Sequence, residues 1–249
     1  AENFAEMSLE LGGKSPFIVF DDANIESAVN GAVAGIFSAS GQSCVAGSRL
    51  YLHEDIADDF LERMVAIAKA LVIGDPQAEE TEMGPLCTTG QIAHIETQVA
   101  IAEQEGGRIL CGGKRIPGPG LFFEPTIIEC PRQGMTIVDT ELFGPILAVQ
   151  RFTNEAEAIE LANDTKHGLA AGLFTRDGAR QIRMAKKLKS GMVWVNTYRM
   201  ISPIAEFGGV KTSGHGREAG LQAMYDYTRA KTIWINLSDE SIANPFQPR

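Results

Sequence analysis

Short apolar runs alternate with amphipathic segments along most of this 249-residue chain. Residues 16–20 read PFIVF, and from Ile25 to Phe37 apolar residues recur at three- and four-residue steps, a spacing that predicts one buried helix face. Further strands are predicted at 48–53, 108–111, 145–152, 169–175 and 192–196, and further helices at 56–71, 92–105, 155–163 and 179–188. Strands that alternate with helices in this way predict an α/β fold, with a largely parallel sheet flanked by helices.

The composition argues against several classes of protein. The balance of 22 Lys+Arg against 32 Asp+Glu gives a net charge of -10, which disfavours nucleic acid and anionic membranes as partners. No apolar run approaches the roughly 20 residues that a membrane span needs. The 4 cysteines form no C-x-x-C pair and the 4 histidines are scattered, so neither a metal site nor a disulfide framework is indicated. We therefore expect a cytoplasmic protein without a metal, although a targeting segment upstream of residue 1 would lie outside this sequence.

Cys44 stands between two small tripeptides, Gly41-Gln42-Ser43 and Val45-Ala46-Gly47, which leave room for a substrate to reach its sulfur. A thiolate that attacks a carbonyl carbon can form a thioester. A lone cysteine is more often a small buried apolar residue, and its ordinary pKa of about 8.5 means that a nucleophile needs help from nearby amides or a base. The flanking residues are what make Cys44 a candidate nucleophile.

Glu10 lies between two leucines and just ahead of Gly12-Gly13. An apolar setting raises the pKa of a carboxyl group toward the range useful for a general base. The two glycines permit a close approach of backbone. The alternative is a surface glutamate on an edge strand. In the functional interpretation, Glu10 activates the water that hydrolyses a thioester on Cys44.

Two stretches bear on cofactor binding. Glu141 and Phe143 precede a Gly-Pro turn, and such a pair could hold ribose hydroxyls and pack against a flat ring; the alternative is a turn cap beside a core phenylalanine. Residues 214–219 match the dinucleotide fingerprint G-x-G-x-x-G/A. We reject this match because no predicted strand runs directly into its first glycine.

Four motifs together closely resemble the NAD(P)-dependent aldehyde dehydrogenase superfamily, in order and in spacing. They are LELGGK at 9–14, GQSC at 41–44, ELFGPI at 141–146, and the run from 194–196 through 207–209 to 213–218. The resemblance implies a catalytic domain over 1–235 and an extended tail over 236–249. It also implies that the dinucleotide-binding domain, which lies upstream in the family, is absent from this chain. A C-terminal strand at 232–236 (TIWIN) would suit oligomerisation, so a homo-oligomer is expected.

The resemblance also implies roles for individual residues. Cys44 would attack an aldehyde to give a thiohemiacetal that passes hydride to the nicotinamide of NAD or NADP and becomes a thioester, which Glu10 would help to hydrolyse. Glu141 would hold the nicotinamide ribose beside Phe143. Glu218 would lie on the proton route. The substrate tunnel would be lined by Ser43, Val45, Arg199, Met200, Ile201 and Phe207.

One departure and two alternatives accompany this interpretation. Relatives usually have proline where this chain has Glu206, so the tunnel wall could carry charge. The chain alone should have little or no dehydrogenase activity. It could instead be a non-catalytic assembly module, or a cofactor-independent thioester or ester hydrolase that uses Cys44 and Glu10. The sequence does not specify which aldehyde is oxidised, or whether NAD or NADP is used.

Overall fold

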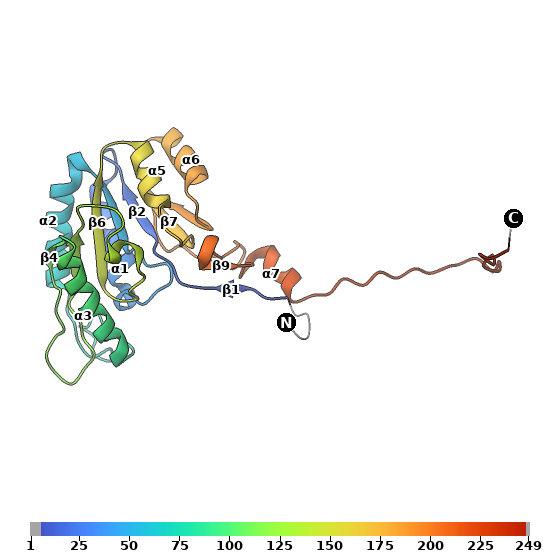
Figure 1. Ribbon diagram of the computed structural model, residues 1–249, viewed down its shortest axis with the longest axis horizontal. Helices are drawn as coiled ribbons and strands as arrows, with labels where there is room; N and C mark the ends of the chain where they lie inside the picture. Colours follow the sequence, from blue (N-terminus) through green and yellow to red (C-terminus); the bar gives the residue numbers. More distant parts are fainter. Residues whose placement is uncertain (1–5, 248–249) are drawn as a thin grey trace.

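The computed structural model describes residues 6–247 and is built on a seven-stranded sheet in the order β4-β5-β6-β3-β2-β7-β8 (Figure 1). The strands are β2 (Pro16–Val19), β3 (Arg49–His53), β4 (Arg108–Cys111), β5 (Thr126–Glu129), β6 (Ile146–Phe152), β7 (Ala170–Phe174) and β8 (Met192–Val195). All neighbouring strands are parallel except β4, which pairs antiparallel with β5 at one edge. The predicted α/β fold with a largely parallel sheet is confirmed.

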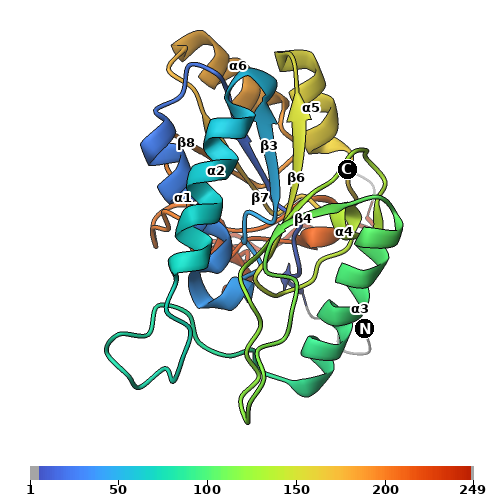
Figure 2. The same cartoon turned by 90° about the vertical axis from the view of Figure 1, so that its left-hand side faces the viewer.

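Helices cover both faces of this sheet (Figures 1 and 2). One face carries α1 (Ile25–Phe37) and α2 (Glu54–Ala70). The other carries α3 (Thr89–Gln104), α4 (Thr136–Asp139), α5 (Glu155–Asn163) and α6 (Gly178–Lys187). A strand that is buried on both faces reads as a continuous apolar run, which is why residues 16–20 contain no polar side chain.

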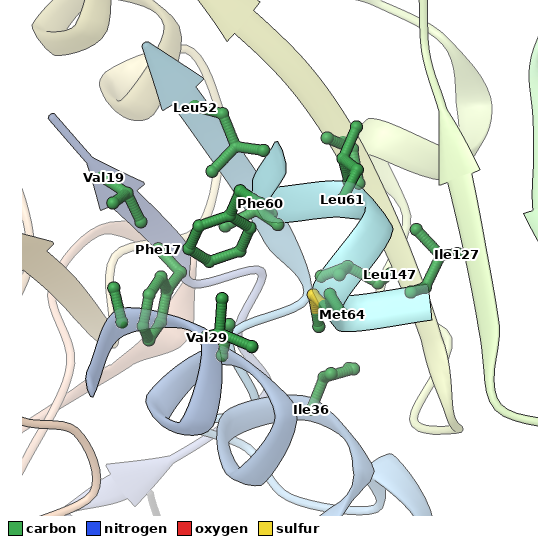
Figure 3. Close-up of a cluster of buried hydrophobic side chains, with 14 of the residues drawn as sticks. Phe17, Val19, Val29, Ile36, Leu52, Phe60, Leu61, Met64, Ile127 and Leu147 are labelled. Carbon is green, nitrogen blue, oxygen red and sulfur yellow. The ribbon is translucent and has the colours of Figure 1, made fainter. Parts of the chain in front are cut away.

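Alternate residues of β2 supply the two faces. Phe17 and Val19 pack with Phe60 and Met64 of α2, as Figure 3 shows, whereas Ile18 belongs to the cluster beneath α5 and α6. All of these side chains are fully buried. The period-2 alternation of a strand therefore anchors helices on both sides of one short segment.

Polar residues set the starts of the helices. The side chain of Asn24 accepts a hydrogen bond from the N–H of Ser27 at 3.1 Å before α1, and the side chain of Asp177 accepts one from the N–H of Ala179 at 2.8 Å before α6. Each cap satisfies a backbone donor that the first helical turn leaves free. Capping thus fixes where the chain turns from strand to helix.

The small elements near the chain ends were not predicted. Strand β1 (Leu9–Glu10) pairs antiparallel with β9 (Gly214–His215), and a helix α7 (Gly220–Asp226) follows. Two short 3-10 turns, Ser38–Gly41 and Lys211–Ser213, precede functional segments. Strand β5 was also missed, because four residues between a proline and a cysteine carry little periodic signal.

The C-terminal tail runs away from the sheet as an extended segment (Figure 1). The strand expected at 232–236 does not form within the described residues of this single chain, and Trp234 is 92% exposed. A strand needs the backbone groups of a neighbour, and none lies beside this segment. Its suitability for oligomerisation therefore stays a prediction.

Candidate active site

Three of the sequence motifs lead directly into adjacent parallel strands. Residues 9–15 precede β2, residues 41–48 precede β3, and residues 141–145 precede β6. These three strands are neighbours in the sheet, so their amino ends meet at one edge. This edge is opposite to the carboxyl edge at which open α/β sheets usually bind ligands. The order of the strands thus brings together three motifs that lie far apart in the sequence.

Cys44 is half-buried at the end of a tight turn. Gly41 has φ +71, and a β-carbon at this position would overlap the carbonyl of Gly144, so only glycine fits there. The thiol lies beside a cluster that includes Trp194 and Phe207. The turn before β3 therefore places the sulfur against aromatic side chains of the chain's C-terminal part.

Burial raises the pKa of the Cys44 thiol. The backbone N–H groups of Cys44 and Val45 lower this pKa, but the negative charges of Glu10 and Glu141 raise it further. The amides that we expected to favour the thiolate are present, and burial outweighs them. Cys44 is therefore protonated at neutral pH, and a nucleophilic role requires that its proton be removed.

Pairing between β1 and β9 positions Glu10, which lies opposite Gly214. Both carboxylate oxygens are buried, and neither accepts a hydrogen bond from the described residues. Burial, together with the charge of Glu218, raises the pKa of Glu10, whereas Arg217 and the nearby N–H of Gly209 lower it. A buried carboxylate without a partner is chemically suited to accept a proton. The surface glutamate considered as an alternative does not fit this burial.

Glu141 lies against the Gly12-Gly13 backbone. Its Oε1 accepts a hydrogen bond from the N–H of Gly13 at 3.0 Å, and a β-carbon on Gly12 would overlap its carboxylate. Burial raises the pKa of Glu141, and the Gly13 N–H and the Lys14 ammonium oppose that rise. Phe143 has φ +50 and is 43% exposed, so it is not the core residue that the alternative requires. A carboxylate beside an exposed ring fits a ribose attached to a flat ring.

The six predicted tunnel residues separate into two groups. Val45 is buried, Phe207 lies beside Cys44, and Ser43 is half-buried next to Cys44. Met200 and Ile201 are exposed in the loop after β8. The role of all six residues, Arg199 included, in substrate binding stays a prediction.

Arg199 has a different environment. Its Nη1 donates to the carbonyl of Ala34 in α1 at 3.4 Å, and it lines a cavity of about 460 Å³. Glu218, the predicted proton-route residue, exchanges backbone hydrogen bonds with Phe207 at 2.7 and 2.6 Å, and its charge acts on Glu10. Backbone pairing thus joins Glu218 to Phe207, and the charge of Glu218 reaches Glu10.

Sequence reasoning missed Tyr198. Its hydroxyl donates to the carbonyl of Val45 at 2.9 Å, and its ring packs edge-on against Trp194 with centroids 4.9 Å apart. Room for the ring comes from the absence of side chains at Gly35, Gly47 and Gly172. These glycines belong to three different segments, so no local pattern could have identified the site that they form.

Ser213 was missed as well. Its hydroxyl donates to the carbonyl of Gly12 at 2.7 Å and accepts a hydrogen bond from the N–H of Gly168 at 2.9 Å. It therefore ties the segment after Glu10 to the segment before β7. The sequence showed only a serine within a matching motif.

Metal ligands, membrane-spanning helices and a second cavity complete the description of the site's surroundings. Residues 6–247 contain no group of three or more His, Cys, Asp or Glu side chains that could hold a metal ion, and none of their helices is long and apolar enough to cross a membrane. A cavity of about 550 Å³, larger than the one beside Arg199, is lined by Arg108, Glu129 and Gln150 at the other edge of the sheet. It contains none of the predicted site residues.

Comparisons with known proteins agree with this geometry. A model of the aldehyde dehydrogenase family matches residues 1–233. The (Z)-2-((N-methylformamido)methylene)-5-hydroxybutyrolactone dehydrogenase of Acinetobacter baylyi is 49% identical over 250 residues, covering 100% of this chain and 51% of that protein. A betaine aldehyde dehydrogenase of Cereibacter sphaeroides is 43% identical over 237 residues, covering 95% of this chain and 49% of that protein.

Solved structures show the same correspondence. PnpE from Pseudomonas sp. WBC-3 is 47% identical with a TM-score of 0.93, covering 98% of this chain and 50% of that one. Betaine aldehyde dehydrogenase from Staphylococcus aureus, in complex with NAD+, is 40% identical with a TM-score of 0.93, covering 99% and 50%. The chain thus spans about half the length of the relatives that it matches. By sequence and fold, it belongs to the aldehyde dehydrogenase family.

Proposed function

We propose that this chain is the nucleophile-bearing half of an enzyme that oxidises an aldehyde to a carboxylic acid with NAD(P). The observation that carries the proposal is the presence of a half-buried thiol, Cys44, and of a carboxylate with two buried oxygens, Glu10, whose charge acts on that thiol. The charge of Glu10 acts on the pKa of Cys44, which supports a site shared by the two groups. Such a pair suits a reaction that forms and then hydrolyses a thioester.

The first step is carried out by Cys44. After the thiol passes its proton to solvent water, Sγ forms a bond to the aldehyde carbon, the C=O π bond breaks, and the carbonyl oxygen becomes the oxyanion of a thiohemiacetal. The backbone N–H of Cys44 donates to this oxygen, an interaction worth about 3 kcal/mol in comparable sites. Loss of hydride from the carbon leaves a thioester on Cys44.

Glu10 performs the second step. Its carboxylate takes a proton from water, and the resulting hydroxide attacks the thioester carbonyl while the C–S bond breaks and Cys44 leaves as the thiolate. The raised pKa of Glu10 makes it a better base than an ordinary carboxylate. Glu218, close enough to influence Glu10, offers the next position for that proton.

The residues present fit the nicotinamide end of the cofactor. Glu141 would accept hydrogen bonds from the ribose hydroxyls, and Phe143 would pack beside the ring. A bound nicotinamide supplies the hydride acceptor. NAD is supported as the cofactor by the NAD+ complex of the Staphylococcus aureus relative. The substrate is a small aldehyde whose tunnel would be lined by the six residues named above.

An acyl-transfer assay tests the nucleophile and base. Cys87 is exposed and would also react with thiol reagents, so the assay uses Cys87→Ser as the background. With p-nitrophenyl acetate, we expect an acetyl adduct on Cys44 by intact mass, more adduct in Glu10→Gln, and none in Cys44→Ala. An adduct elsewhere, or normal deacylation by Glu10→Gln, would contradict the assignments.

The same assay separates the alternatives. A cofactor-independent hydrolase would turn over the ester repeatedly as the isolated chain, but the full-length protein would not oxidise aldehydes with NAD. An assembly module would form no adduct on Cys44. Aldehyde oxidation by the full-length protein, lost on Cys44→Ala, is the outcome that we expect.

We also propose a homo-oligomer in which residues 232–236 add as a strand to a second copy. Ile233, Trp234 and Ile235 are 71%, 92% and 74% exposed on an extended segment, which is unusual for large apolar side chains in a monomer. By analytical ultracentrifugation, a chain ending at 227 should contain fewer subunits per particle than the chain as given. An equal number of subunits in the two proteins would contradict this assignment.

A cytoplasmic location stays a proposal. The four cysteines are all free, as a reducing compartment favours. Fractionation of cells that express the full-length protein would test it.

A further inference from the structure

A cavity of about 460 Å³ opens between α1 and the loop that follows β8. On the helix side it is lined by residues with little or no side chain, Gly31, Ala34, Gly35 and Ser38. Small side chains at these helical steps leave a volume within the range of pockets that bind small molecules. The opposite side is formed by residues 196–199.

Arg199 is the only charged side chain among the residues that line this cavity. Its guanidinium donates to a neutral acceptor, the carbonyl of Ala34, and forms no ion pair within the described part of the chain. A guanidinium has five N–H donors in a geometry that matches a carboxylate. Most of these donors remain available to a ligand.

The backbone of this loop is unusual. Asn196 and Arg199 have φ +54 and +61, a left-handed conformation that is unfavourable for most residues other than glycine. The carboxamide of Asn196 stabilises this backbone conformation. Its Oδ1 accepts a hydrogen bond from the N–H of Thr175 and its Nδ2 donates one to the carbonyl of Thr175, at 3.0 Å each. Backbone held in such a conformation is concentrated at ligand-binding sites.

Tyr198 connects this cavity to the nucleophile. It lines the cavity and also packs in the cluster beside Cys44, with its hydroxyl fixed on the carbonyl of Val45. Tyr198 therefore borders both the cluster that contains Cys44 and the cavity that Arg199 lines.

We propose that Arg199 binds a carboxylate at the far end of the substrate, so that the enzyme prefers aldehydes that carry a negative charge. This inference rests on the proposed aldehyde oxidation at Cys44. Glu10 and Glu141 place negative charge near the thiol. A substrate carboxylate is therefore favoured away from the sulfur, and Arg199 lies there.

Glu206, at which this chain departs from the family pattern, does not neutralise the charge of Arg199. Glu206 is exposed and lies against Gly220, and it does not line the cavity. A cationic aldehyde in this cavity would be repelled by the positive charge of Arg199. The charge at this position thus predicts a preference opposite to that suggested by the name betaine aldehyde dehydrogenase, which several relatives carry.

The test compares two aldehydes of equal carbon number, succinic semialdehyde and butanal, with the full-length protein and NAD. We expect kcat/KM to favour succinic semialdehyde, and Arg199→Met to lower the ratio of the two kcat/KM values about 10- to 100-fold, as expected for the loss of hydrogen bonds to a charged group. Arg199→Lys keeps the charge and should retain part of the preference. Arg199→Glu should reverse it and favour betaine aldehyde over succinic semialdehyde.

A matched control uses Arg176, an exposed arginine after β7 that does not line the cavity. Arg176→Met should leave the ratio unchanged, and thermal unfolding of each variant shows whether the fold is retained. If both aldehydes are oxidised and Arg199→Met changes the ratio less than twofold, the role of Arg199 is wrong while aldehyde oxidation stands. If neither aldehyde is oxidised and no thioester forms on Cys44, the proposed function fails together with this inference.

Discussion

Gly12→Ala tests why the residue before Gly13 has no side chain. The added methyl group would overlap Oε2 of Glu141 and lie 2.7 Å from its Cδ, so the carboxylate must move. Movement breaks the 3.0 Å hydrogen bond from the N–H of Gly13 to Oε1. Loss of a hydrogen bond to a charged group costs about 1.5–3 kcal/mol, and the partial exposure of Glu141 reduces this to about 1–2 kcal/mol.

Urea unfolding of the chain measures this cost as a fall of about 0.3–1 M in the transition midpoint. A double-mutant cycle identifies its source. In a Glu141→Ala background the colliding atoms are gone, so Gly12→Ala should cost less than about 0.5 kcal/mol.

Gly90→Ala serves as the control, because a β-carbon at Gly90 in α3 meets nothing within 4 Å. It should be neutral or stabilise the chain by up to about 1 kcal/mol. An equal cost of Gly12→Ala in both backgrounds would show that space for Glu141 is not the reason for this glycine.

Three further predictions concern the reactive groups. Because burial raises the pKa of Cys44, its rate of alkylation by iodoacetamide should keep rising with pH above about 8.5, and a plateau near pH 7 would contradict this. The charge of Glu10 also raises the pKa of Cys44, so Glu10→Gln should lower the apparent pKa of this thiol and speed its alkylation at pH 8. Slower alkylation would mean that Glu10 activates the thiol. The chain as given should bind NAD with a Kd at or above about 1 mM, because Glu141 and Phe143 contact only the nicotinamide end, and micromolar binding by calorimetry would refute this placement.

Local pattern was sufficient for the regular elements. Helices α1 and α2 and strands β2 and β3 form where periodicity predicted them, because a strand buried on both faces must be apolar throughout and a one-sided helix must repeat its apolar residues at three- and four-residue steps. Strand β5 and the pair β1–β9 could not be predicted, because two to four residues become a strand only when a partner elsewhere in the chain offers its backbone groups.

For the site, the sequence by itself determined which groups are available: a thiol among small residues, a carboxylate between leucines, and a carboxylate two residues before an aromatic ring. The tertiary structure decided their chemical state. Burial raises the pKa values of both Cys44 and Glu10. The surroundings of both groups come from distant parts of the chain, since Phe207 packs in the cluster with Cys44 and the N–H of Gly209 opposes the rise at Glu10. The tertiary structure also decided that Arg199 faces a cavity lined by small residues of α1, because only packing brings the loop after β8 against that helix.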